Sequence, residues 1–402
     1  MATQQPGRPG NLTAEQTAKL KEMWTEIFEL TSGTRSTRAV SDAASEEHTP
    51  KKGKRLSMFK KKDKSVEAEA GDNDKHGQNR VFKEALAQMS PAELREALWG
   101  MAKHDHPDAL LLRFLRARKW DVSAALVMAV ATLQWRRETQ VDSDIMFKGE
   151  AGANDEFMTQ LRMGKSFFHG IDRAGRPCCY VRVRLHRSGE QSDAALERFT
   201  VWTIETGRML LRPPVDTATI VFDMTDFTLA NMDYTPVKFM IKCFEANYPE
   251  SLGQVLVYKS PWVFQGIWKV IRGWLDPVVA AKVHFVSKVS ELEEYIPREH
   301  IMKELGGDEQ FTYSYVEPNP GEDDQMRDAD TKAKIEADRA ALVTRFEDET
   351  KRWIAGDDAV QSERQTTATA MKDNYWRLDP YVRARSLYDR LGILRGKEVK
   401  WY

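Results

Sequence analysis

Apolar residues recur every three or four positions along several stretches of the first third of the chain, a spacing typical of amphipathic helices. Thr13 and Gln16 form a capping box at the start of the first stretch, and Ser90 and Glu93 form another within residues 80–103, which are therefore a helix or a helix pair. The pattern predicts helices over residues 13–30, 80–103, 107–120 and 122–139. We therefore expect this part of the chain to fold as a helical module.

From about residue 155 the pattern changes to short apolar runs separated by amphipathic stretches. Residues 178–185 alternate between apolar and polar side chains, which predicts a strand buried on one face. Residues 218–224 are almost continuously apolar, as in a strand covered on both faces. Further strands are predicted over 167–170, 254–258 and 283–286, and helices over 192–211 and 234–247. Strands that alternate with helices predict an α/β fold with a mostly parallel sheet.

The last part of the chain is predicted to be helical again. Residues 328–354 carry an apolar stripe at helical spacing, and residues 374–394 are aromatic enough to pack back onto the body of the protein. Between them, residues 357–369 are polar and are expected to form a loose linker.

Residues 32–79 lack aromatic side chains except Phe59 and are rich in serine, lysine and acidic residues, so we expect a disordered insertion. Within it, the run Lys51–Lys64 is strongly basic. The run suits a solvated linker, a nuclear-import signal, or a tether to anionic membranes that phosphorylation of Ser57 would weaken. All three interpretations are compatible with the sequence.

Composition and charge narrow the class of protein. The 402 residues include 60 Lys and Arg against 61 Asp and Glu, a net charge of −1 that argues against nucleic acid as a partner. Three cysteines cannot build a disulfide framework, which favours a reducing compartment, and no run of about 18 apolar residues is present to span a membrane. Because the N-terminus has no signal sequence, the protein is expected in the cytoplasm.

The chain has no nucleophile elbow, phosphate-binding loop, zinc-type His-Glu pair or dinucleotide fingerprint. We therefore expect no enzymatic activity, no metal and no cofactor. Binding is better supported, because Glu250 lies at the turn into an apolar strand and Lys282 lies among apolar neighbours. A carboxylate and an ammonium there would suit a ligand with both hydroxyls and a phosphate. The alternative is that both are surface residues at the ends of elements.

Between these two charges lies an unusually aromatic segment, whose large side chains are Trp262, Phe264, Trp268 and Trp274. They could be ordinary core residues. However, Lys269 and Arg272 share the same helical stretch, and large apolar side chains beside cations suit a membrane interface. Gly266 and Gly273 are candidate hinges, so the segment is also a candidate lid.

A series of motifs resembles the CRAL-TRIO lipid-transfer proteins, and most of all the fungal phosphatidylinositol transfer proteins of that family. The motifs are LLRFLRARKWDV at 111–122, DRAGRP at 172–177, NYPE at 247–250, LDP at 275–277 and LGG at 305–307. The resemblance covers about residues 80–315. It implies a helical N-terminal module followed by a lipid-binding α/β domain, in which the segment after Pro261 is a gate over an acyl-chain cavity.

On this interpretation the chain has five parts. They are an N-terminal helix, the insertion, the CRAL-TRIO N-terminal module, the lipid-binding domain and a helical C-terminal extension, over residues 1–31, 32–79, 80–150, 151–315 and 316–402.

The resemblance also implies site residues. In that family, basic residues of the first module and a Glu and a Lys of the second bind the phosphatidylinositol headgroup. The corresponding residues of this chain are Arg118, Lys119, Glu250 and Lys282. Family members that also bind phosphatidylcholine use hydroxyl-bearing side chains. At those positions this chain has Phe168, Cys179, Ala218 and Ile220, none of which carries a hydroxyl. The resemblance therefore favours phosphatidylinositol together with a different second ligand, or an apolar ligand such as squalene or a sterol.

We therefore expect a phosphatidylinositol transfer protein that exchanges or presents lipid between membranes through a gated cavity. The alternative is a carrier or sensor of another lipophile that acts as a membrane-recruited regulatory adaptor. The expected partners are phosphatidylinositol, the membrane surface and lipid kinases, with the protein itself a monomer at the membrane periphery.

Overall fold

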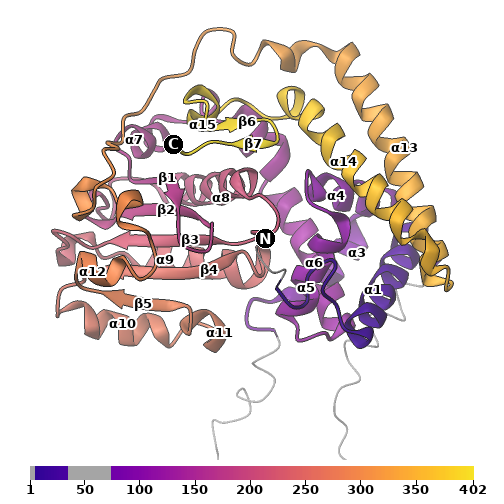
Figure 1. Ribbon diagram of the computed structural model, residues 1–402, viewed down its shortest axis with the longest axis horizontal. Coiled ribbons are helices and arrows are strands. Elements are labelled where there is room, and N and C mark those ends of the chain that lie inside the picture. The colour runs from indigo at the N-terminus through magenta and orange to yellow at the C-terminus, as the bar shows by residue number, and fades with distance from the viewer. Residues whose placement is uncertain (1–4, 35–73) are drawn as a thin grey trace, which may run out of the picture.

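A computed structural model describes residues 5–34 and 74–402 of the chain. A group of helices lies beside a five-stranded sheet, and the C-terminal segment reaches from the sheet over the helices and back (Figure 1). The basic run Lys51–Lys64 and Ser57 lie outside the described residues, so their interpretations remain predictions.

The N-terminal helices follow the predicted pattern. They are α1 (Ala14–Ser32), α3 (Gln78–Gln88), α4 (Pro91–Ala102), α5 (Pro107–Ala117) and α6 (Val122–Glu138). Both predicted capping boxes are present, at Thr13 and at Ser90. The apolar faces of the helices meet around Trp24, which stacks on Trp99 with ring centroids 6.0 Å apart. The expected helical module is confirmed.

The predicted insertion ends earlier than expected. Residues 74–77 lead into α3, and the Gln78 side chain is buried and donates to the backbone oxygen of Ala246 at 3.1 Å. The prediction of disorder is therefore wrong for residues 74–79, because they pack against the α/β domain.

The sheet confirms the α/β fold. Its strands, in spatial order, are β1 (Ser166–Ile171), β2 (Pro177–Arg182), β3 (Ala218–Asp223), β4 (Leu252–Tyr258) and β5 (Val283–Val286). β1 runs antiparallel to β2, and the remaining pairs are parallel. The helices of this domain are α7 (Asp155–Arg162), α8 (Asp193–Leu210), α9 (Tyr234–Lys242), α10 (Phe264–Arg272), α11 (Pro277–Ala280) and α12 (Val289–Leu292).

The prediction for β2 was wrong in two respects. The strand ends at Arg182, the last residue paired with β3, and Val183–Leu185 forms a turn of 3-10 helix. The face expected to meet solvent is buried, with Tyr180 1% and Arg182 8% exposed. Arg182 pairs with Glu304 at 2.7 Å, so a segment after β5 covers this face of the sheet.

The other face of the sheet is less completely filled. In β3, three side chains are fully buried while Ala218, Ile220 and Phe222 are only half-buried. Elements do cover this strand on both faces, as predicted, but one face is packed less tightly. The half-buried side chains line a space between the sheet and the helices on that face.

The C-terminal elements are α13 (Ala329–Ile354), α14 (Gln361–Val382), α15 (Leu387–Arg390), β6 (Leu394–Arg395) and β7 (Glu398–Val399). α13 confirms the predicted helix, but the loose linker predicted over 357–369 is wrong, because α14 begins at Gln361. Arg364 is 2% exposed and donates to Asp108 at 2.8 Å and to Thr350 at 3.1 Å. A polar helix is stable here because its buried groups satisfy one another.

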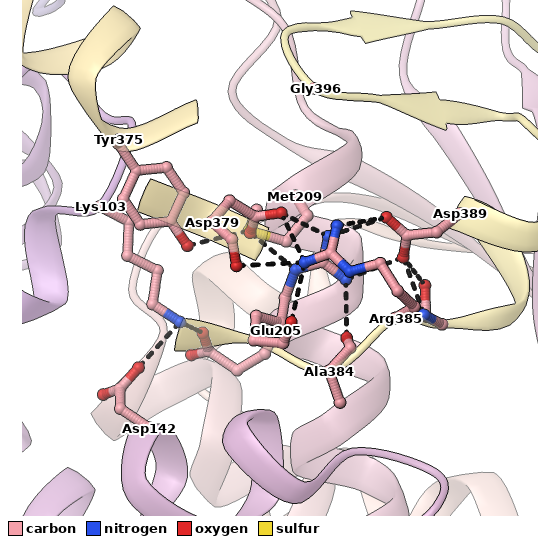
Figure 2. A network of polar contacts seen from close by, with 12 residues as sticks. Lys103, Asp142, Glu205, Met209, Tyr375, Asp379, Ala384, Arg385, Asp389 and Gly396 are labelled. Atoms are coloured by element: carbon pink, nitrogen blue, oxygen red, sulfur yellow. Dashed lines mark hydrogen bonds and ion pairs between the residues drawn. The ribbon is translucent and has the colours of Figure 1, made fainter. Parts of the chain in front are cut away.

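The C-terminal extension also packs onto the α/β domain, as its aromatic content predicted. Tyr375, Trp376 and Tyr388 join the same apolar cluster as α8. Beyond them, Arg383 bridges Asp379 at 2.7 Å and Asp389 at 2.9 Å. Arg385 pairs with the same two carboxylates at 3.0 Å and 3.1 Å (Figure 2).

A second buried ion-pair network joins the helical module to the sheet domain. Glu205 on α8 is fully buried and accepts from Lys103 at 2.9 Å and from Arg136, while Lys103 also meets Asp142 at 2.8 Å (Figure 2). Burial alone would raise the pKa of Glu205, but the charges of Arg136, Lys103 and Arg208 outweigh it and lower that pKa. Separating the two domains would therefore leave unpaired ions in apolar surroundings.

Candidate functional site

A cavity of about 230 Å³ lies between the half-buried face of the sheet and helices α8, α9 and α10. Its wall is almost entirely apolar. The sheet contributes Ile220, Phe222, Val255 and Val257, and the helices contribute Phe199, Met240, Phe264 and Trp268. Such a space suits hydrocarbon rather than a polar metabolite.

A second compartment of about 90 Å³ adjoins the first, and the two share wall residues such as Val181 and Leu252. The structure brings together here the four positions that the resemblance marked, and they lie in its wall: Phe168, Cys179, Ala218 and Ile220. Burial raises the pKa of the Cys179 thiol to about 12, so this side chain is a neutral, weakly polar group.

The hydroxyl groups that do line this compartment are largely engaged elsewhere. Thr200 and Thr203 donate to the carbonyls of Leu196 and Phe199 in their own helix, each at 2.8 Å. Ser251 donates to a backbone carbonyl at the turn before β4. The compartment therefore offers few free polar groups to a headgroup.

The aromatic segment between the two predicted charges divides into three parts. Phe264 and Trp268 lie on α10 and form part of the cavity wall. Trp274 lies outside the cavity, against Tyr234 on α9 with ring centroids 5.2 Å apart. Trp262 is 87% exposed. Two of the four aromatic residues predicted as gate and cavity residues therefore line the cavity, and two do not.

α10 is attached to the body of the protein mainly through its apolar face. Among the described residues, no hydrogen bond or ion pair links a side chain of 264–272 to another element. After α10, the backbone N–H of Asp276 donates to Glu245 at 2.7 Å, and Glu245 also pairs with Lys75 and His76. The carboxyl end of the segment is thus anchored by polar contacts that sequence analysis missed.

Glu250 and Lys282 lie at the same edge of the sheet. Glu250 precedes β4 and Lys282 precedes β5, and these strands are neighbours with Val255 opposite Val283. The Lys282 ammonium donates to the backbone oxygen of Leu252 at 2.8 Å. Both side chains are half-buried. They are therefore neither fully exposed surface residues nor fully buried ions.

The two predicted cations of the helical module, Arg118 and Lys119, differ in their surroundings. Arg118 ends α5 and hydrogen-bonds the side chain of Gln78; burial lowers its pKa, and the negative charge of Asp276 opposes that shift. Lys119 is exposed. Arg118 therefore faces the anchored end of the segment that carries α10, whereas Lys119 faces solvent.

Two further arginines, which sequence analysis did not select, approach Glu250 from α5. Arg113 donates to the backbone oxygen of Glu250 at 2.8 Å, and the Arg116 Nε lies 3.8 Å from its carboxylate. The sequence could have indicated this, because two arginines three positions apart on a helix lie on the same face.

No group of three or more metal-ligating side chains is found in the part of the chain that the structure describes. Within the same residues, no helix is long and apolar enough to cross a membrane. The three cysteines, Cys178, Cys179 and Cys243, are buried and unpaired with one another.

Comparison with known proteins places these features in a family. The family profiles described as CRAL/TRIO domain and CRAL/TRIO, N-terminal domain match residues 161–307 and 79–130. CRAL-TRIO domain-containing protein C3H8.02 of Schizosaccharomyces pombe is 41% identical over 96% of this chain and 92% of its own length. Phosphatidylinositol transfer protein CSR1 of Eremothecium gossypii is 38% identical over 98% of this chain and 99% of its own.

Proposed function

This chain belongs to the CRAL/TRIO family, and we propose that it is a non-enzymatic carrier that exchanges phosphatidylinositol between membranes or presents it there. The observation that carries the proposal is an apolar cavity beneath α10, whose wall includes Leu252 and Val283. The half-buried Glu250 and Lys282 lie next to these wall residues, and Arg118 lies near the Asp276 turn that follows α10. Acyl chains gain about 0.8 kcal/mol for each CH₂ group removed from water, so a closed apolar cavity suits a lipid in transit.

The charges near the cavity favour an inositol phospholipid. Lys282 has two N–H groups beyond the one given to Leu252, and these can donate to a phosphate. The Glu250 carboxylate can accept from inositol hydroxyls, which choline lacks. A relative over almost the whole chain is named a phosphatidylinositol transfer protein, which further supports this choice.

Exchange requires α10 to move away from the sheet at a membrane. Its outer surface carries exposed Val270 with Lys269 and Arg272, and Trp262 projects just before it. Apolar side chains beside cations suit contact with an anionic membrane surface. We propose that the protein works in the cytoplasm as a monomer that binds membranes transiently, and that lipid kinases receive the lipid it presents.

A vesicle assay tests the proposal. Donor vesicles contain either fluorescent phosphatidylinositol or fluorescent phosphatidylcholine, and transfer to acceptor vesicles is followed with catalytic amounts of the protein. We expect rapid transfer of phosphatidylinositol and little transfer of phosphatidylcholine. Equal rates for both lipids, or no transfer of either, would contradict the proposal.

A second candidate is a carrier or sensor of squalene or a sterol that acts as a membrane-recruited adaptor. It is favoured by the lack of hydroxyls at Phe168, Cys179, Ala218 and Ile220, which leaves the inner compartment apolar. Lipid extraction of the purified protein followed by mass spectrometry distinguishes the two, because a neutral lipid without phosphatidylinositol would favour the second.

A further inference from the structure

The cavity beneath α10 has a second polar region at its opposite end. Lys165, His186 and Asp233 contribute to its wall there. Lys165 directly precedes β1, whose Ser166 is level with Val181 and so with the carboxyl ends of β3 and β4. Glu250 precedes the amino end of β4, seven residues before Val257, which is roughly 23 Å along the strand at about 3.3 Å per residue. Lys282 precedes β5, at the opposite side of the sheet from β1.

Lys165 is a buried cation without a close counter-ion. It is 6% exposed, and its ammonium donates to the side-chain oxygens of Gln191 at 2.9 Å and Gln160 at 3.4 Å, both neutral amides. Among the described residues, no carboxylate oxygen lies within 4.0 Å of it. A buried charge without a partner typically costs several kcal/mol, so such an ammonium is a binding site for an anion.

The neighbouring charges do not fill this role. Glu190 and Asp233 attract Lys165 only from a longer range, while burial lowers its pKa to about 8. Asp233 is already engaged, because it pairs with His186 at 3.3 Å and accepts from the backbone N–H of Thr235 at 3.0 Å. The third N–H of the Lys165 ammonium therefore remains for a ligand in the cavity.

We propose that Lys165 forms an internal subsite for the anionic end, a carboxylate or a phosphate, of an amphiphilic ligand whose hydrocarbon lies along Phe222, Met240 and Val257. A neutral hydroxyl or ester could accept the same hydrogen bond but would leave the charge uncompensated. The subsite does not depend on phosphatidylinositol binding at the other end of the cavity, so either function can fail without the other.

Fluorescent cis-parinaric acid and its methyl ester test the subsite, since the two probes differ only in charge at one end. The variant Lys165→Met keeps most of the side-chain volume, and Lys303→Met removes an exposed lysine elsewhere as the control. We expect Lys165→Met to weaken binding of the acid about tenfold or more and to leave the ester almost unchanged. Equal effects on acid and ester, or no effect on the acid, would overturn the proposal.

The unaltered protein offers a second measurement if Lys165→Met does not fold. Its preference for the acid over the ester should fall between pH 7 and pH 10, as Lys165 loses its proton. The other titratable groups that face Lys165 are Glu190, Asp233 and His186. Burial lowers the pKa of His186, so this imidazole stays neutral over the range. A preference that stays constant with pH would overturn the assignment.

Competition then identifies the source of the anion. Displacement of cis-parinaric acid by oleic acid assigns a carboxylate ligand, and displacement by lysophosphatidic acid assigns a phosphate ligand. Oleyl alcohol has the same hydrocarbon chain as oleic acid but no charge. If it displaces the probe as well as the two anions do, the subsite does not select for charge and the proposal is refuted.

Discussion

Replacing Lys282 by alanine tests the proposed headgroup site with little disturbance of the fold. Its ammonium makes one hydrogen bond, to the backbone oxygen of Leu252, and the side chain is half-buried at an edge that water can reach. Because water can replace the lost donor, we expect the free energy of unfolding to fall by about 1 kcal/mol or less.

The expected effect on lipid binding is much larger. A hydrogen bond between an ammonium and a phosphate contributes about 1.5–3 kcal/mol, which corresponds to roughly a tenfold to hundredfold loss of affinity. Glu250 would meanwhile keep its contacts to the inositol hydroxyls, so the loss should be specific to lipids whose phosphate sits at this edge.

The assay is the initial rate of phosphatidylinositol transfer between vesicles, measured with protein well below saturation, together with a thermal melt of each variant. Lys288→Ala is the matched control, because Lys288 is exposed and follows β5 at the opposite end of the strand. Both substitutions remove one positive charge. If Lys282→Ala transfers phosphatidylinositol at the unaltered rate, the assignment is wrong. If Lys288→Ala loses as much transfer, general attraction to the membrane accounts for the effect instead.

Three further predictions concern the stability of the folded protein and its binding to membranes. Glu205→Gln leaves Lys103 and Arg136 buried without a full counter-charge, so urea unfolding should show a loss of about 3 kcal/mol, and an unchanged midpoint would contradict the role of this ion pair. Trp262→Ser removes an 87% exposed side chain, so it should reduce co-sedimentation with anionic vesicles while leaving the melting temperature unchanged; a lower melting temperature would instead indicate a packing role. Burial lowers the pKa of His104 to about 4, below its value in the unfolded chain, so the unfolded chain binds a proton first as the pH falls. The free energy of unfolding should therefore decrease from about pH 6.5 towards pH 4, by up to about 1.4 kcal/mol per pH unit. In urea titrations His104→Phe should reduce this slope, and an equal slope would refute the assignment.

Much of the fold could be predicted from local sequence because its signals are local. The capping boxes at Thr13 and Ser90 each need only four residues, and both are present. The linker predicted over 357–369 failed for the opposite reason. Its helix depends on Arg364 meeting Asp108, a residue more than two hundred positions earlier, and no local pattern reports such a contact.

The site was predictable to a similar degree. The resemblance selected Phe168, Cys179, Ala218 and Ile220, and the structure places them in one wall. Lys165 was missed because a single lysine before a strand normally lies at the surface. It is buried here and hydrogen-bonded to Gln160 near the end of α7 and Gln191 before α8, which is a tertiary arrangement.

The distribution of polar contacts identifies the wall of the cavity that is least restrained. The fixed walls are braced by buried ion pairs such as Lys103–Glu205, and moving them would separate charges in apolar surroundings. Among the described residues, the side chains of α10 make only apolar contacts with other elements, while the Glu245 carboxylate accepts from the backbone N–H of Asp276 in the turn that follows. Local opening begins where such restraints are fewest. The segment should therefore swing about Asp276, with its Phe264 end moving outward. Because α10 follows β4, that end lies at the carboxyl ends of the parallel strands, so lipid would enter from the side of Lys165 while the residues around Lys282 stay in place.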